Sequence, residues 1–271
     1  MRGVSADSWA ASVAELDQQA ESGDAVQVGQ LGSDMFAVHD VLTVEPSLRR
    51  ALTDPSAPTE AKTGLVSGVF SGKVAEQTVT VLETVAGQRW SSTSDFVSTV
   101  EQLGVMAYVI AADQEGQLSA LEDDLFRFGR VVSANPALRD ALTNKQVAVG
   151  HRQELVTDLL RDKVSAPAVR LVVQAVASRH QSLEMALEEY QKVAADRQAR
   201  VVALVRSAVE LTDDERTRLA AALGQLYGRD IHLNTVVDPD VLGGIKVQIG
   251  DEVIDGTVAG RLDDARRRIA G

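Results

Sequence analysis

The segment most suggestive of chemistry is SGVFSGKV at residues 67–74, where a glycine and a lysine adjoin as they do in phosphate-binding loops. Such a loop holds phosphate with backbone amides and a lysine. It needs a glycine five residues before the Gly-Lys pair and a Ser or Thr after it. Ser67 and Val74 occupy those two positions, and the preceding residues have a helical pattern where the motif requires a strand. We therefore expect no nucleotide site here.

No set of side chains suits acid–base, nucleophilic or metal chemistry. The acidic clusters at 121–125 and 211–215 have the spacing of carboxylates that compensate the dipole at a helix N-terminus. Cysteine is absent, which excludes disulfides and thiolate metal sites. The histidines lie far apart, none at a metal-ligand spacing, and we expect them at solvated surface positions. They are His39, His151, His180 and His232. The sequence therefore predicts no catalytic residue, no metal site, no cofactor and no small-molecule substrate.

The composition is that of a soluble globular protein, with 45% hydrophobic and 24% charged residues. Its net charge of -12 argues against a nucleic-acid partner, because such binding depends on clustered Lys and Arg. The longest apolar stretch, residues 103–112, is about half of the roughly 20 residues that a membrane-spanning helix needs. The N-terminal residues lack the apolar run of a signal peptide. We expect the protein in the cytoplasm.

Part of the sequence occurs twice. Residues 31–103 align with residues 121–193 without a gap, and 17 of these 73 positions are identical. The identities are mostly apolar residues and helix breaks, such as Pro46 with Pro136. A duplicated folding unit keeps its core and its breaks while its surface drifts. The copies differ in charge, which indicates either surface drift or different partners.

The apolar pattern of residues 5–196 is that of amphipathic helices, with spacings of three and four residues. We predict a mainly α fold class. Two tandem six-helix-type bundles, residues 1–103 and 104–196, would be followed by a small C-terminal α+β domain, residues 197–271. The helix expected at 94–112 contains no breaker except Gly104. We therefore expect it to pass from the first bundle into the second without a flexible linker.

The last part of the chain changes to a period of two. This alternation predicts strands at 230–237 and 244–250, and a β-branched run at 199–211 could supply a third. Between them a helix is expected to start at Thr212, with Glu215 three residues on in a capping-box pattern. A final helix is expected at 257–270.

Turn residues punctuate residues 237–262. Paired glycines supply positive φ angles, and Gly-Asp and Asp-Gly pairs favour tight turns. The residues of this turn motif are Gly243, Gly244, Gly250, Asp251, Asp255 and Gly256, with Arg261 following.

At this stretch the sequence resembles the delta subunit of bacterial F-type ATP synthase, the family of the mitochondrial oligomycin-sensitivity-conferring protein. The family has an aliphatic residue with Gly-Gly, then Gly-Asp, an Asp-Gly-Ser-like turn and Arg-Leu. These elements correspond here to Leu242-Gly243-Gly244, Gly250-Asp251, Asp255-Gly256-Thr257 and Arg261-Leu262. Residues 45–54 and 135–144 both resemble a segment of the family's helical bundle. The ordinary member has one bundle, and this chain departs from it by holding a second copy.

The resemblance implies a non-catalytic stator subunit of the peripheral stalk. It would link the N-terminal helices of the α subunits in the catalytic head to the b subunits and so support proton-driven ATP synthesis. It would lie peripherally at the cytoplasmic face of the membrane, as part of the complex. In the family, helices one and five of the bundle form a groove for an α-subunit helix, and the C-terminal domain contacts the b stalk.

The resemblance places candidate groove residues in both copies. In the first they are Trp9, Val13, Leu16, Val74, Thr78, Val81 and Val85. In the second they are Met106, Val109, Ala112, Val164, Ala168, Leu171 and Ala175. Both sets recur at helical spacing, so the alternative is that they are simply core positions.

A helical adaptor that binds RNA or protein is the alternative function, because six-helix bundles of similar topology bind RNA in transcription factors. The acidic charge counts against RNA. An enzyme is the third possibility, and no constellation of residues nominates a reaction.

Overall fold

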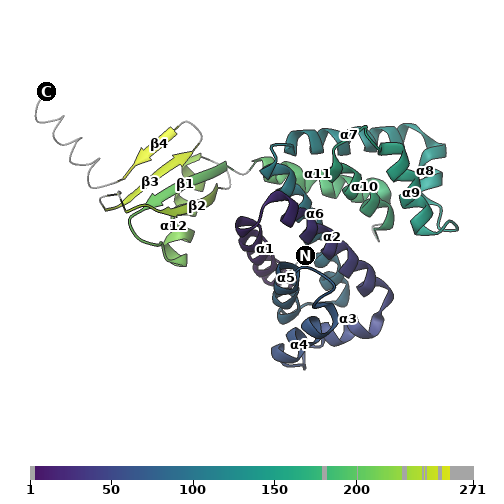
Figure 1. Cartoon of the computed structure of the whole chain (residues 1–271), viewed down its shortest axis with the longest axis horizontal. Helices are drawn as coiled ribbons and strands as arrows, with labels where there is room; N and C mark the ends of the chain where they lie inside the picture. The colour runs from purple at the N-terminus through teal and green to yellow at the C-terminus, as the bar shows by residue number, and fades with distance from the viewer. Residues whose placement is uncertain are drawn as a thin grey trace, which may run out of the picture. The chain divides into compact units, whose positions relative to one another are not determined.

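The computed structural model describes residues 4–178, 182–199, 201–227, 231–239, 241, 243–249 and 252–256. Over these residues the fold is mainly helical, with twelve helices and one small mixed sheet (Figure 1). The helices are α1 (Val4–Ser22), α2 (Ala25–Val44), α3 (Pro46–Thr53), α4 (Thr59–Phe70), α5 (Glu76–Gly87), α6 (Thr93–Gln114), α7 (Leu118–Ala134), α8 (Pro136–Thr143), α9 (Val149–Leu160), α10 (Ala166–Ala177), α11 (Leu183–Ala199) and α12 (Asp213–Tyr227). The strands are β1 (Val201–Ser207), β2 (Ile231–Val237), β3 (Ile245–Ile249) and β4 (Glu252–Asp255). Among the described helices, none has both the length and the hydropathy to cross a membrane.

The helices confirm the helical prediction for residues 5–196, and their bounds recur with the 90-residue shift of the sequence match. Helices α8, α9 and α10 reproduce α3, α4 and α5 residue for residue. Proline is the first residue of both α3 and α8. Its fixed φ suits a first helical turn, and the amide hydrogen that it lacks would be unpaired there in any case. The same breaker therefore starts the same short helix in both copies.

Two clusters of buried apolar side chains form the interior of the helical part. One consists chiefly of residues from α1 to α6, and the other chiefly of residues from α6 to α11. Helix α6 belongs to both, with Leu103 in the first cluster and Val109 in the second. Because both sides of α6 are covered, its residues 103–112 are all buried, and this stretch is apolar all round. Contacts between residues join Met1–Ala195 into one compact unit. The boundary at 103/104 falls inside α6 and stays a prediction.

Helices α2 and α6 approach closely at two glycines. A Cβ added at Gly32 would lie 2.8 Å from the Tyr108 ring, and one at Gly104 would lie 2.6 Å from the Phe36 ring. Phe36 and Tyr108 stack with ring centroids 5.6 Å apart. Gly104, the potential breaker in the sequence, therefore lies within a continuous helix. It is needed for space, not to end the helix.

Residues Asp196–Gly271 form the second compact unit. Its sheet has the strand order β2-β1-β3-β4. Strands β1 and β2 pair in parallel, with α12 between them in the chain, while β3 pairs antiparallel to both β1 and β4. Ala203, Val205, Val247 and Leu223 are buried in its core. The small α+β character predicted for the C-terminal part is confirmed.

The predicted helix start and paired glycines are also confirmed. The Thr212 amide donates to Glu215 Oε2 at 2.9 Å, and the Glu215 amide donates back to Thr212 Oγ1 at 3.4 Å. These two bonds are the capping box. Gly243 and Gly244 have φ angles of 70° and 80°, which other residues resist.

The rest of the turn motif is described only in part. The Gly256 amide donates to the Ile245 carbonyl at 3.0 Å, and a Cβ on Gly256 would lie 3.1 Å from that oxygen. A glycine is required there because the two backbones approach closely. Asp255 is the last residue of β4 and pairs with Lys246. Leu242, Gly250, Asp251, Thr257, Arg261, Leu262, the helix expected at 257–270, and His180 lie outside the described residues.

Candidate protein-binding faces

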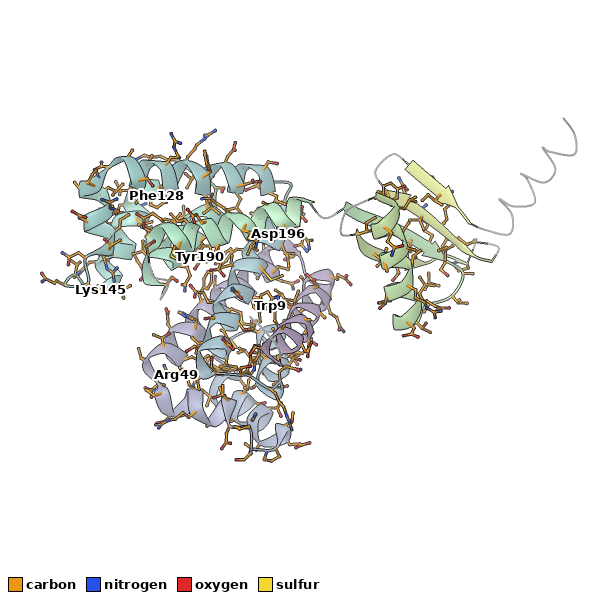
Figure 2. The ribbon with its side chains drawn as sticks, turned by 180° about the vertical axis from the view of Figure 1, so that it is seen from behind. Trp9, Arg49, Phe128, Lys145, Tyr190 and Asp196 are labelled. Atoms are coloured by element: carbon orange, nitrogen blue, oxygen red, sulfur yellow. The ribbon has the colours of Figure 1, made fainter. Side chains whose placement is uncertain are left out.

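The first candidate set is divided between interior and surface. Leu16, Thr78, Val81 and Val85 are fully buried among the helices. The other three members, Trp9, Val13 and Val74, are half-buried and pack against the same cluster from outside. Figure 2 shows the position of Trp9 in the helical part. Any apolar surface that this set offers a partner must come from these three side chains.

Helix α1 meets α5 along a polar flank, not along Trp9. Thr84 on α5 donates to the Glu15 carboxylate at 3.5 Å, and the Ser8 hydroxyl donates to the Arg89 carbonyl just beyond α5. At 3.6 residues per turn, Glu15 lies about 120° around α1 from Trp9. The line along which α1 and α5 meet therefore runs on the Glu15 side of α1, and Trp9 and Val13 lie about 120° and 160° around the helix from Glu15.

The second candidate set is almost entirely interior. Met106, Val109 and Ala112 on α6, and Ala168, Leu171 and Ala175 on α10, are all buried. Val164, before α10, is half-buried. The two sets occupy related helices, yet the second exposes less surface than the first. The binding role of both sets stays a prediction.

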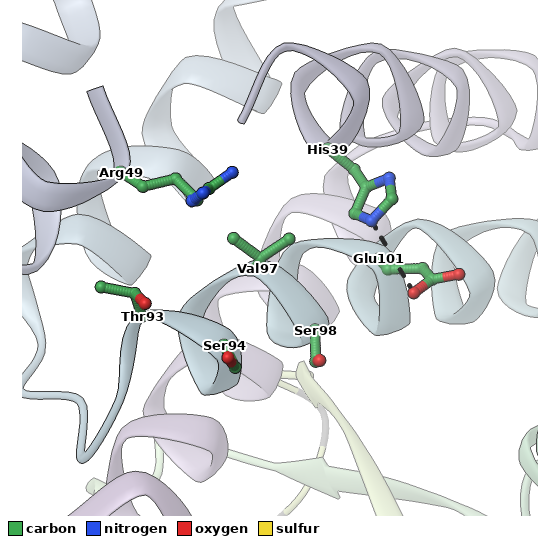
Figure 3. Close-up of a pocket in the computed structure, with 7 residues that line it drawn as sticks. All are labelled: His39, Arg49, Thr93, Ser94, Val97, Ser98 and Glu101. Carbon is green, nitrogen blue, oxygen red and sulfur yellow. Dashed lines mark ion pairs between the residues drawn. The ribbon is translucent and has the colours of Figure 1, made fainter. Parts of the chain in front are cut away.

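His39 is buried, so the expectation of a surface position is wrong for it, whereas His151 is exposed as expected. Only 2% of the His39 side chain is exposed, because α2 is covered on a second face where it packs on the later helices. His39 borders a pocket of about 270 Å³ (Figure 3). The pocket is lined by His39, Arg49, Thr93, Ser94, Val97, Ser98 and Glu101.

The charged groups of this pocket are held by neighbours within the chain. Arg49 donates to the Leu42 and Thr43 carbonyls at 2.5 and 2.8 Å, which satisfies the last carbonyls of α2. His39 Nε2 lies 3.9 Å from Glu101 Oε2. Arg49 thus has a structural role as the C-terminal cap of α2, and the pocket presents no nucleophile with an adjacent base.

Glu101 also links α6 to α11. The Tyr190 hydroxyl donates to Glu101 Oε1 at 2.7 Å, and Gln102 donates to the Glu189 carboxylate beside it. Burial, and then the negative charge of Glu101, hold the pKa of the Tyr190 hydroxyl well above its usual value of 10.0. These polar contacts, together with the two apolar clusters, join the earlier helices to the later ones.

A pair of aspartates escaped the reasoning from sequence. Asp34 Oδ2 accepts from the Ala75 amide at 2.8 Å and from Thr78 Oγ1 at 3.0 Å, just before and within the first turn of α5. Asp124 Oδ2 accepts from the Ser165 amide at 2.8 Å, at the start of α10. In each copy a carboxylate from one helix therefore stabilises the N-terminus of another. The sequence contained a signal for this pair, because Asp34 and Asp124 are identical residues at equivalent positions of the repeat.

Comparisons with known proteins all point to one family. The family model described as "ATP synthase delta (OSCP) subunit" matches residues 105–269. A protein of Streptomyces avermitilis named "ATP synthase subunit delta" is 46% identical over 269 residues, which cover 99% of this chain and 98% of that protein. A protein of the same name from Thermobifida fusca is 41% identical over 272 residues and 100% of both chains. One from a Nocardioides species is 48% identical over 89% of this chain and 87% of its own.

A solved structure is also similar at a distance. A chain of the cryo-EM structure of the Toxoplasma gondii mitochondrial ATP synthase hexamer is 17% identical, covers 62% of this chain and 97% of its own, and has a TM-score of 0.28. A likeness this distant carries no argument about how the helices are arranged.

Proposed function

The chain belongs to the ATP synthase delta (OSCP) subunit family, and from that membership we propose that it is a stator subunit that joins the catalytic head to the peripheral stalk. It is a non-catalytic subunit of the ATP synthase complex. In this role it holds the head still against the torque of the rotor, so that proton flow is coupled to ATP synthesis. It lies peripherally at the cytoplasmic face of the membrane through its contacts with the complex.

The division of the chain into two compact units supports this role. The helical unit, with the bundles proposed at 1–103 and 104–196, contacts N-terminal helices of the α subunits. The C-terminal unit, residues 197–271, contacts the b subunits. Two modules that each hold one part of the same assembly gain from a high effective concentration. The chain can then anchor firmly although neither interface is very tight alone.

The surface of the helical unit favours a helix as its partner. Ala11 and Glu15 on α1 and Thr84 on α5 are half-buried where the two helices meet, and Trp9 and Val13 leave part of their apolar area uncovered on the other flank of α1. A partner helix recognises such a surface by laying its apolar face against it. The remaining candidates, from Leu16 to Val85 and from Met106 to Ala175, would support the groove from below.

Co-purification tests the proposed role directly. The full chain, carrying an affinity tag and expressed in its own organism, should bring down the α and b subunits of the ATP synthase. When the chain is depleted, the released head should still hydrolyse ATP, whereas the membranes should no longer pump protons when ATP is added. If the tagged chain returns without ATP synthase subunits, or if depleted membranes stay fully coupled, the stator role is refuted. Retention on RNA at low salt would favour the adaptor instead.

A further inference from the structure

Helix α2 docks on the later helices along one stripe of its surface. Gly32, Phe36 and His39 follow each other at the four- and three-residue spacing of a single helical face. Gly32 comes closest to the Tyr108 ring of α6, and Phe36 stacks on that ring. Only 9% of Phe36 is exposed, and it belongs to the cluster formed by the later helices. This stripe is distinct from the α2 face that fills the first cluster, so α2 is packed on two sides.

His39 shows where this stripe lies. Its ring contacts α6 through Glu101, 3.9 Å away, and α10 through Gln174, whose Nε2 lies 3.5 Å from His39 Nδ1. Helices α6 and α10 also contact each other. A residue that touches both helices must lie over the line where they meet. Helix α2 therefore lies across the groove between α6 and α10.

The equivalent pair of helices in the first copy is less covered. Helices α1 and α5 hold the same places in the first copy as α6 and α10 in the second. Thr84 on α5 and Gln174 on α10 are 90 residues apart and correspond in the repeat. Thr84 is half-buried, whereas Gln174, under α2, is 4% exposed. On α1, Ala11 and Glu15 border the groove and are half-buried, and Gln18 is exposed. The same pair of helices is covered by a helix in one copy and uncovered in the other.

We propose that α2 fills, from within the chain, the helix-binding groove of the second copy, so that the α1–α5 groove is the one open helix seat among the described helices. The buried α2 stripe shows that this pair of helices accepts another helix packed over it. Identification of the occupant with the N-terminal helix of an α subunit rests on the proposed function. The closure of the second groove by α2 does not rest on that proposed function.

Charge specifies the occupant further. Helices α1 and α5 carry six carboxylates and no Lys or Arg. Of these, Asp7 and Glu76 are exposed, and Glu15 is half-buried at the groove. Opposite charges across an interface steer binding and fix its register. The occupant is therefore an amphipathic helix with basic residues beside its apolar face, and its affinity falls as salt rises.

Titration calorimetry on the full chain measures how many binding sites it has and where they lie. The ligand is a synthetic peptide of the N-terminal segment of the α subunit from the same organism. We expect one peptide per chain. Gln18→Arg places a positive charge in the open groove at an exposed position, so the fold is kept, and it should weaken binding by at least about 10-fold. Ala6→Arg is the matched control, because Ala6 is exposed on α1 but lies about 140° around the helix from Ala11. It should leave binding within about twofold of the unmodified chain.

Three outcomes separate the possibilities. Two peptides per chain would overturn the closed second groove while leaving the stator role intact. Loss of binding in Ala6→Arg with retention in Gln18→Arg would move the site to the Trp9 flank and overturn the α1–α5 seat. No binding at all would count against the proposed function and leave the position of α2 to be decided separately.

A cross-link decides the position of α2 without any partner. The chain has no cysteine, so a pair can be introduced cleanly. His39→Cys with Gln174→Cys should be joined by a short bis-maleimide reagent in the folded chain, because the ends of the two native side chains lie 3.5 Å apart. Val26→Cys with Gln174→Cys is the control, since Val26 is about 20 Å further along α2. If the first pair fails to cross-link, or both pairs cross-link equally, α2 does not occupy the groove.

Discussion

Replacing Gly104 by alanine should destabilise the helical unit, although alanine is the better helix former. Within a helix the exchange alone is worth about 1 kcal/mol in favour of alanine. The added Cβ, however, would lie 2.6 and 2.7 Å from two carbons of the Phe36 ring and 3.2 Å from Met35 Cβ. Overpacking of a filled core costs about 1–3 kcal/mol, and the displaced ring also loses about 1 kcal/mol of stacking on Tyr108. The packing cost wins, and we expect a net loss of about 1–3 kcal/mol.

Gly64→Ala is the matched control. Gly64 lies in α4, and a Cβ there would meet no atom of the described residues within 4 Å. The helix preference then acts alone, so the variant should gain about 1 kcal/mol. Urea unfolding followed by tryptophan fluorescence measures both variants, because both tryptophans of the chain pack on the first cluster. In thermal unfolding each kcal/mol corresponds to about 2–4 °C for a unit of this size. If Gly104→Ala is as stable as Gly64→Ala, the close crossing of α2 and α6 is refuted.

Three further predictions concern particular side chains. Phe36→Ala should cost about 3–5 kcal/mol of unfolding free energy. Phe126, its counterpart in the repeat, is 55% exposed, so Phe126→Ala should change the unfolding free energy by less than about 0.5 kcal/mol. Equal losses in urea unfolding would contradict this difference in burial. The pKa of Tyr190 is raised in the folded state, so its contribution to stability is complete below the unfolded-state pKa of 10.0. That contribution is lost as the pH rises through the folded-state pKa, and stability should therefore fall above about pH 10. Tyr190→Phe should flatten that alkaline fall, and an unchanged pH profile would remove Tyr190 as its cause. Hydrogen bonds from the Thr212 amide and then its hydroxyl lower the pKa of Glu215 below 4.5. The contribution of this cap to stability is therefore present above pH 4.5 and is lost as the pH falls through the folded-state pKa. Amide exchange in the first turn of α12 should quicken on acidification, and Glu215→Ala should abolish this pH dependence of the exchange rate.

Much of the local structure was readable from the sequence. The helices that start at Pro46 and Pro136, the capping box at Thr212 and the paired glycines at 243 and 244 were each predicted from residue types alone. Each depends on groups within a few positions of one another, so the sequence carries the whole cause. The duplication was equally visible, because a copied unit keeps its core positions.

The candidate surfaces were not readable in the same way. Trp9 and Leu16 recur at helical spacing, and that spacing cannot distinguish a groove that faces a partner from a side chain that faces the core. His39 was expected at the surface because polar residues usually are, and it is buried because α2 is covered on two sides. The role of Asp34 also depends on an amide 41 positions away in the chain.

The sequence by itself determined that the chain is helical to about residue 196, that one unit was copied, and that a small α+β domain follows. These features follow from periodicity and from contacts between near neighbours. Only the tertiary structure decided how the copies differ in use. Helix α6 serves both clusters and α2 covers the groove of the second copy, so equivalent residues such as Phe36 and Phe126 have opposite exposures. Burial depends on what packs on a helix from elsewhere in the chain, and no local pattern contains that information.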